Sequence, residues 1–247
     1  MSGAAPAAPR PCVVCGGTRF SPLCQDGGFA WEECGACGIV RLCQDLSFAD
    51  QVAIQDEQLA DRYIRLYGAK LPRKIAECRR RLRWITRRIQ GGRFLDVGCN
   101  QGYMTDVAAS AGFSATGLEI IPAMVRRARE LFPDRDFIIS PIETFDPGEA
   151  LFDAVYCSEV IEHVVDPRGF LGAIARLMRP GGALLLTTPH IREYRRAGYR
   201  QMNAPNHKIY FNNANLGRLL GECGFGGTWI RFNPFKGIQL VTTRQHD

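Results

Sequence analysis

The sequence has no long hydrophobic run. None of its stretches approaches the roughly 18–20 consecutive apolar residues that span a membrane. Residues 1–11, rich in alanine and proline, have no apolar core, so we expect a disordered lead there and neither a signal peptide nor an anchor. Internal repeats are absent too. With 247 residues, 46% of them hydrophobic, the chain suffices for one α/β domain plus a small appendage, and we expect a cytoplasmic protein.

Without such a signal, the ten cysteines do not indicate a secreted disulfide scaffold. Four of them form two Cys-x-x-Cys pairs, Cys12 with Cys15 and Cys34 with Cys37, and a glycine follows each pair. The 18 residues between the pairs fit a four-cysteine zinc ribbon. The alternative, a thioredoxin-like redox pair, would need a surrounding βαβ pattern that is missing. We therefore expect a ribbon over residues 12–43 that holds a structural zinc ion.

Acidic residues are scarce in one segment. From Arg73 to Arg93 there are nine basic residues and one acid, Glu77, which gives this segment a charge of +8 in a chain of formal charge +6. Apolar residues recur there at three- and four-residue steps, which predicts an amphipathic helix with its arginines outside, in solvent. A nucleic-acid partner is the alternative, but no aromatic residues are interleaved to stack on bases.

From residue 93 onward, strand-like and helix-like segments alternate at βαβ spacing, which predicts a mostly parallel sheet. The expected strands are Phe94–Val97, Ala115–Leu118, Asp136–Ile139, Ala154–Cys157, Ala183–Thr188, Ile209–Phe211, Thr228–Phe232 and Ile238–Thr242. The expected helices are Asp50–Tyr67, the basic helix between Leu71-Pro72 and Gly91-Gly92, Tyr103–Ala111, Pro122–Phe132, Pro167–Met178 and Asn213–Cys223. Residues 44–92 thus form a helical linker or cap, and 93–247 the α/β domain.

The turn after the first of these strands carries the most informative pattern, Asp96-x-Gly98-x-Asn100-x-Gly102. Its spacing differs from the Gly-x-Gly-x-x-Gly of dinucleotide-binding loops. Glycines let the backbone turn sharply and approach a ligand closely. Asp96 offers a negative charge to an ammonium, and the helix start at Tyr103 favours a carboxylate. A ligand with an ammonium, a carboxylate and a nucleoside fits these groups.

This turn resembles motif I of the class I S-adenosylmethionine (SAM) dependent methyltransferases. The block from Tyr156 to Pro167 resembles one found in ubiquinone-type O-methyltransferases and natural-product relatives, and Leu177–Gly182 extends the similarity. The resemblance covers residues 94–242. It implies a Rossmann-like sheet of seven strands with helices on both faces. Asn100 departs from the family's commonest glycine, although asparagine tolerates left-handed backbone better than most residues.

The resemblance also implies where SAM would bind. Glu119, which ends the second strand 21 residues after Gly98, takes the ribose role. Ile142 would cover the adenine ring and Glu143 would meet its exocyclic amine. The cofactor-binding residues expected are Asp96, Gly98, Asn100, Gly102, Tyr103, Glu119, Ile120, Ile142, Glu143 and Ser158.

Methyl transfer needs a nucleophile held in line with the donor, often helped by a base. His163, His207 and His190 are the candidates, and a fourth histidine in the tail is set aside. Glu159, Glu162 and His163 are spaced to share one face of a helical turn. In ubiquinone-type enzymes the matching residues are associated with a divalent metal. We favour the alternative, a Glu162–His163 hydrogen-bonding pair at a helix start.

The insertion at residues 190–206 is rich in arginine and tyrosine. Arginine recognises phosphate and carboxylate bidentately, so one hypothesis is a lid over an anionic substrate and the other a solvated loop. The function expected is methylation of O or N of a small molecule in sugar or natural-product biosynthesis. One alternative is a zinc-ribbon rRNA or tRNA base methyltransferase, although the chain lacks the Asn/Asp-Pro-Pro-Tyr/Phe block. The other is a non-catalytic SAM-binding scaffold, which the intact acids and glycines of the turn oppose.

Overall fold

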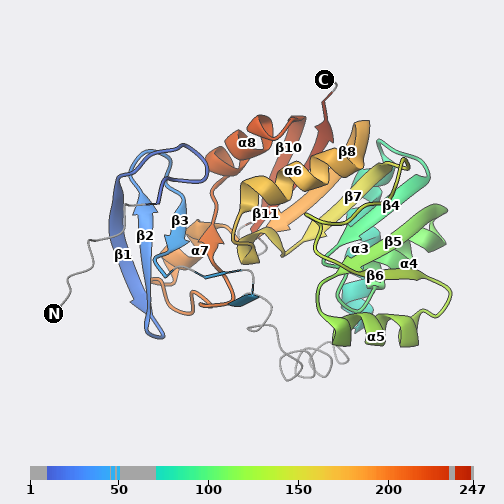
Figure 1. Ribbon diagram of the computed structural model, residues 1–247, viewed down its shortest axis with the longest axis horizontal. Helices are drawn as coiled ribbons and strands as arrows, with labels where there is room; N and C mark the ends of the chain where they lie inside the picture. Colours follow the sequence, from blue (N-terminus) through green and yellow to red (C-terminus); the bar gives the residue numbers. More distant parts are fainter. Residues whose placement is uncertain (1–9, 45, 48, 51–70, 234–236, 246–247) are drawn as a thin grey trace.

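Two β-sheets organise the protein (Figure 1). The computed structural model describes residues 10–44, 46–47, 49–50, 71–233 and 237–245. The helix predicted over Asp50–Tyr67 and most of the predicted disordered lead lie outside these residues. In the part of the chain that is described, no helix combines the length and the apolar character needed to cross a membrane.

The larger sheet has seven strands in the order β10-β11-β8-β7-β4-β5-β6. Its strands are β4 (Gly92–Val97), β5 (Phe113–Glu119), β6 (Asp136–Ile139), β7 (Phe152–Ser158), β8 (Met178–Thr188), β10 (Phe225–Asn233) and β11 (Gly237–Arg244). Strands β8, β7, β4, β5 and β6 run parallel, whereas β11 and β10 complete the sheet with antiparallel pairing. The predicted Rossmann-like α/β sheet of seven strands is confirmed.

Helices cover both faces of this sheet (Figure 1). On one face, α3 (Leu71–Thr86) and α4 (Tyr103–Ser110) pack against Phe94 of β4, and α5 (Pro122–Leu131) contacts β5 and β6. On the other, α6 (Pro167–Leu177) and α8 (Asn213–Glu222) pack in a core with Leu95, the next residue of β4. The alternation follows from the two-residue period of a strand, since both faces are buried.

Two local expectations need correction. The basic helix α3 ends at Thr86 and not at Gly91-Gly92, because the N–H groups of Arg88 and Ile89 turn back to the carbonyl of Ile85. The strand expected at Ala183–Thr188 begins earlier, because β8 already starts at Met178. Residues 179–181 form an exposed bulge there, since the β7–β8 register shifts after Met178.

The smaller sheet joins the cysteine-rich segment to a distant part of the chain. It contains β1 (Phe20–Asp26), β2 (Phe29–Cys34), β3 (Val40–Leu42) and β9 (Ile209–Tyr210), in that order. Val40 pairs with Tyr210 and Arg41 with Ile209. The strand predicted at Ile209–Phe211 therefore exists, but it belongs to the sheet of the ribbon at the end of the molecule marked by β1–β3 (Figure 1).

Candidate active site

A cavity of about 1050 Å³ opens where the parallel strands β4, β5 and β7 end. Strand β4 lies between β5 and β7, so this is the point at which the strand order reverses, the usual ligand site of an open α/β sheet. Eleven predicted site residues line the cavity: Asp96, Gly98, Asn100, Tyr103, Glu119, Ile120, Ile142, Glu143, Ser158, His163 and His207. Residues of η1 (Ile161–His163) and α7 (Ile191–Arg196) line its other end.

The glycine-spaced turn adopts the left-handed backbone that its sequence predicts. Gly98 has φ of 69° and Asn100 has φ of 52°, so the irregular asparagine takes a conformation it tolerates. A Cβ on Gly98 would lie 2.4 Å from Val160 Cγ2 and collide with it; both residues line the cavity. Gly102 packs differently, because a Cβ there would lie 2.5 Å from Phe137 Cζ in the core. Gly102 therefore shapes the start of α4, and it is not among the residues that line the cavity.

Two buried acids hold this turn. Asp96 Oδ2 accepts hydrogen bonds from Thr105 N at 3.0 Å and Thr105 Oγ1 at 2.8 Å. Burial raises the pKa of Asp96 to about 7, although both Thr105 bonds favour the ionised form. Glu119 accepts from the N–H groups of Asn100, Ile120 and Ile121 at 2.8–3.2 Å, and burial raises its pKa as well. Each acid thus organises the cofactor loop as well as facing the cavity.

Arg81 of α3 contradicts the expectation that the arginines of this helix lie in solvent. Its Nη1 donates to Tyr156 Oη at 2.6 Å and to Ser158 Oγ at 2.7 Å, and its side chain is only 11% exposed. The reason is that β7 ends beneath α3 with two hydroxyl groups that accept from a guanidinium. Arg73, Lys74 and Glu77 of α3 line the cavity too. The sequence signal was the helical spacing that places these residues and Arg81 on one side of α3.

The acidic block after β7 does not form the helical turn that its spacing predicts. Glu159 has φ of 57° and lies before η1, and its Oε1 accepts from Thr187 Oγ1. Glu162 is fully buried, and its Oε2 accepts from Thr188 Oγ1 at 2.8 Å. Its Oε1 has no partner among the described residues, and it lies 3.9 Å from His163 Nε2. The predicted Glu162–His163 hydrogen bond is therefore not formed, because this separation exceeds hydrogen-bonding range.

Two imidazoles, His207 buried and His163 partly buried, meet edge to face at this end of the cavity, with ring centroids 4.7 Å apart. His163 Nδ1 lies 2.9 Å from the carbonyl oxygen of Asn206, so it must donate and Nε2 is left as an acceptor. Tyr210 donates its hydroxyl proton to Met202 O, so it accepts from His207 Nδ1 at 2.8 Å. Burial lowers the pKa of His163 to about 4 and of His207 to about 3, so both rings are neutral.

His190 is placed apart from the other two histidines. Its Nδ1 accepts from Arg192 N at 2.9 Å and caps α7, and it is not among the residues that line the cavity. Two other residues of the insertion, Glu193 and Tyr194, do line the cavity. Glu193 was not predicted as a site residue. The arginines of residues 190–206 do not line it, and Arg195 forms an ion pair with Glu33 of β2.

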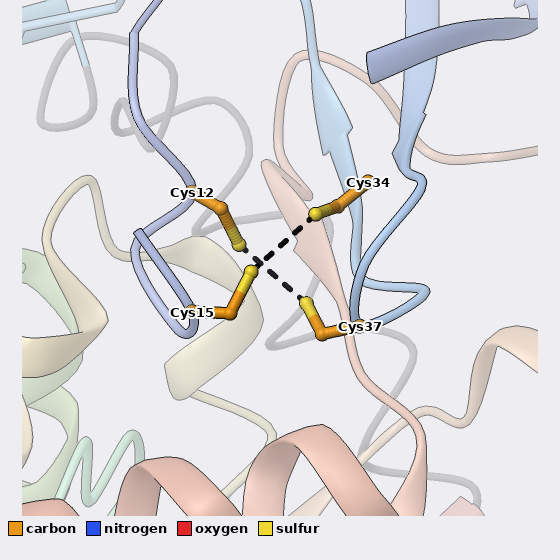
Figure 2. Close-up of side chains that lie close together, drawn as sticks. All are labelled: Cys12, Cys15, Cys34 and Cys37. Carbon is orange, nitrogen blue, oxygen red and sulfur yellow. Dashed lines mark hydrogen bonds between the residues drawn. The ribbon is translucent and has the colours of Figure 1, made fainter. Parts of the chain in front are cut away.

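The four paired cysteines gather at one point (Figure 2). Their sulfur atoms lie within 4.8 Å of one another, with Cys12 Sγ 3.5 Å from Cys37 Sγ and Cys15 Sγ 3.6 Å from Cys34 Sγ. Tetrahedral zinc with Zn–S bonds of about 2.3 Å separates its sulfurs by about 3.8 Å. Burial raises the pKa of Cys34, but N–H groups of Cys37 and Ala36 oppose it and bring the pKa down to about 7. The donor set therefore fits a four-thiolate metal site.

Comparison with known families decides the assignment. Residues 67–227, more than half of the chain, match the family described as "Methyltransferase domain". The chain belongs to the class I SAM-dependent methyltransferases. Residues 94–102 with Glu119 are then the expected SAM loop of a methyltransferase, at the carboxyl ends of β4 and β5.

Curated relatives of this methyltransferase include two from Xanthomonas. It is 36% identical over 115 residues to a ubiquinone biosynthesis O-methyltransferase of Xanthomonas axonopodis pv. citri, a match that covers 44% of this chain and 48% of the relative. It is 37% identical over 117 residues to the protein of the same name from Xanthomonas campestris pv. campestris, again covering 44% and 48%. The chain thus spans about half the length of the curated relatives that it matches.

Solved structures share the fold of this methyltransferase at low identity. Streptomyces venezuelae DesVI aligns with a TM-score of 0.61 at 17% identity, over 81% of this chain and 99% of that chain. CalS10 from Micromonospora echinaspora, described as an amino pentose methyltransferase in its SAM-bound form, aligns with a TM-score of 0.56 at 18% identity, over 82% and 99%. At these identities the similarity establishes the fold alone.

Proposed function

We propose that this methyltransferase transfers the methyl group of SAM to an oxygen or nitrogen atom of a small molecule. One observation carries the proposal: the residues of the SAM loop and two neutral imidazoles line the same cavity. Its volume of about 1050 Å³ is at the upper end of the range for ligand pockets and leaves room for an acceptor beside the cofactor.

SAM supplies an electrophilic methyl group on a sulfonium, and the chain has to orient the acceptor and remove its proton. His163 and His207 each present Nε2 as a free lone pair to the cavity, because Nδ1 of each ring is committed to a hydrogen bond. Either ring can accept the proton that an attacking hydroxyl or amine releases. Glu162 Oε1 lies 3.9 Å from His163 Nε2, and burial raises the pKa of this acid well above its ordinary value, which favours its neutral form.

The polar groups at the acceptor end indicate which chemistry the substrate carries. Glu162 Oε1, Glu193 Oε1 and Asn206 Oδ1 are buried without a donor among the described residues. Together with the two Nε2 atoms they form a set of hydrogen-bond acceptors, and a buried acceptor left unpaired is destabilising. Of these acceptors, the two Nε2 atoms are the ones that a substrate O–H or N–H group can reach from the cavity. The named activities of the relatives, O-methylation in ubiquinone biosynthesis and methylation of an amino pentose, support hydroxyl or amine acceptors.

The lining of the cavity bears on the hypothesis that the arginines of the insertion bind an anionic substrate. The arginines of residues 190–206 do not line the cavity, so the acceptor end offers a carboxylate or phosphate none of these cations. The cations that line the cavity come from α3 instead, as Arg73, Lys74 and Arg81, so an anionic acceptor would have to bind against that helix. The trio Glu162, His163 and His207 places one ligand atom each within 4.8 Å, which also suits a cation, so divalent metal dependence belongs in the assay.

We further propose that Cys12, Cys15, Cys34 and Cys37 hold zinc. The sulfur separations, the N–H groups directed at Cys34 and the spacing of the pairs support it. Four thiolates close the coordination sphere, so the ion would stabilise structure and take no part in chemistry.

The test combines calorimetry with a transfer assay. We expect SAM to bind and to label catechols or amino sugars from a panel that also contains RNA, with and without added magnesium. Gly98→Ala, expected to lose the cofactor, serves as the negative control. Absence of SAM binding would contradict both the enzyme and the scaffold readings, whereas labelling of RNA alone would favour a base methyltransferase.

A further inference from the structure

We propose that the cysteine ribbon, residues 12–43, positions the acceptor end of the active site, so that its metal controls methyl transfer without controlling SAM binding. The inference rests on the proposed function and on zinc at the four cysteines. The ribbon would then be part of the catalytic architecture and not a separate module for recruiting partners.

Main-chain pairing connects the ribbon to the catalytic segment. Strand β3 pairs with β9, and Leu42 N donates to Lys208 O at 2.9 Å. On the other side, Lys208 N donates to the carbonyl oxygen of Glu162 at 2.8 Å. Residues 208–210 are therefore held between the ribbon and η1, and His207 is the residue immediately before them. A shift of β3 would move His207 relative to His163.

Side-chain packing follows the same route. Trp31 of β2 is 1% exposed, and its ring lies 5.3 Å from that of Tyr210. Tyr194, which lines the cavity, also packs against Tyr210, and the centroids of the two rings lie 4.3 Å apart. The hydroxyl of Tyr210 accepts from His207 Nδ1 and so fixes the tautomer that leaves Nε2 free. Trp31 and Tyr210 are positioning residues in this arrangement, since neither lines the cavity.

The metal site lies at the base of this structure. Strand β2 ends at Cys34 and β3 begins at Val40, so the second cysteine pair forms the turn between them. Cys37 O accepts from the side-chain amides of Asn212 and Asn215 at the start of α8. The first pair is attached to α6, where Arg168 donates to Val13 O. The metal would join these two attachments and fix β2 and β3 between them.

The cofactor end of the cavity does not depend on the ribbon in this way. Asp96 and Glu119 accept from Thr105, Asn100, Ile120 and Ile121, all of them in β4, β5 and the turns and helix that follow. The ribbon supplies none of these described contacts. Loss of the ribbon metal should therefore disorganise acceptor binding and leave the SAM loop intact.

The first experiment removes zinc from the full-length protein with a chelator, and the metal content is then checked. Three quantities are measured with and without zinc: hydrogen exchange, binding of S-adenosylhomocysteine (SAH), and methyl transfer to an acceptor from the panel. We expect faster exchange in peptides covering 39–43 and 207–211 but not 94–102. SAH affinity should stay within about threefold, less than about 1 kcal/mol. Turnover should fall by about tenfold or more and return with added zinc.

A second variant tests the route without removing metal. Tyr210→Phe keeps the ring against Trp31 and removes the hydroxyl that binds His207. Zinc content and SAH affinity should match wild type while kcat falls by about tenfold. Tyr199→Phe, whose ring packs against the same cluster but does not contact His207 in the described structure, is the matched control and should retain its turnover.

Either of two results would overturn the inference: turnover that is independent of zinc and of the Tyr210 hydroxyl, or SAH binding and protection of 94–102 lost together with zinc. Failure of the proposed function is a separate outcome. A wild-type protein that binds no SAH contradicts methyl transfer, while the exchange of 207–211 with and without zinc still decides whether the ribbon holds that segment.

Discussion

The two ends of the cavity are built in different ways. At the cofactor end, Asp96, Gly98 and Asn100 belong to one turn, and Glu119 at the end of the next strand binds that turn directly. At the acceptor end, groups from η1, α7 and the segment before β9 converge, and the ribbon supports them from outside. One end is specified locally and the other by contacts between distant segments. Changes at each end should therefore affect different steps.

The largest effect should come from His207→Gln. Loss of a positioned base lowers turnover by about 1000-fold, whereas SAH affinity should not change, because none of the described contacts of His207 involves residues 94–102. Labelled transfer and SAH calorimetry measure the two quantities. His190→Asn is the control: asparagine is a good helix cap, so α7 should persist and turnover should stay near wild type. Equal losses in both variants would contradict the placement of the two histidines.

Gly98→Ala should produce the converse result. Left-handed backbone and the collision with Val160 together destabilise the loop by about 3 kcal/mol, which corresponds to SAH binding about 100-fold weaker. Gly172→Ala in α6, where a Cβ meets no atom within 4 Å, is the matched substitution and should bind SAH normally. Wild-type affinity in Gly98→Ala would show that the cofactor does not approach this turn.

SAH affinity should depend on pH through Asp96. Burial holds the pKa of Asp96 at about 7, and the ionised form attracts the ligand ammonium. Binding below pH 7 therefore requires release of a proton, and affinity should fall by about tenfold for each pH unit of acidification. Above pH 7 it should level off. Calorimetry should be repeated across this pH range with Asp96→Asn. If Asp96 is the titrating group, the SAH affinity of the variant will not depend on pH. If another group is responsible, SAH affinity will fall with acidification equally in the variant and in wild type.

The smallest effect is expected for Arg195→Ala. Its ion pair with Glu33 is exposed, with 44% of the arginine side chain accessible, and such pairs contribute at most about 1 kcal/mol. Turnover should remain within about twofold of wild type. A large increase in the KM of an anionic acceptor would instead support the lid hypothesis that the cavity lining disfavours.

The sequence predicted the cofactor end well because its determinants are close together in the chain. Strand β6 was predicted to the residue, and the prolines at 122 and 167 marked two helix starts. Asn100 was recognised as a residue that tolerates the backbone it adopts. In each case the local pattern and the tertiary structure require the same conformation.

The acceptor end could not be predicted in the same way. Strand β9 was expected as a strand, but its partner β3 lies far away in the sequence, so its place in the sheet of the ribbon could not be predicted. Helical spacing places Arg81 on one side of α3 with Arg73, Lys74 and Glu77, but only the hydroxyls at the end of β7 show that this side faces the cavity. Glu193 lies between arginines in a segment that reads as basic. Long-range pairing decided these positions.

The position of β9 has a consequence for biosynthesis. Translation delivers the ribbon before β9, and the more N-terminal unit usually folds first. Within the described residues, however, the outer edge of β3 is paired by residues 209–210, which follow much later in the sequence. Until those residues leave the ribosome, the nascent ribbon presents an unpaired strand edge, the kind of surface that invites aggregation. The sheet of the ribbon is therefore completed only after the α/β strands β4 to β8 have been synthesised.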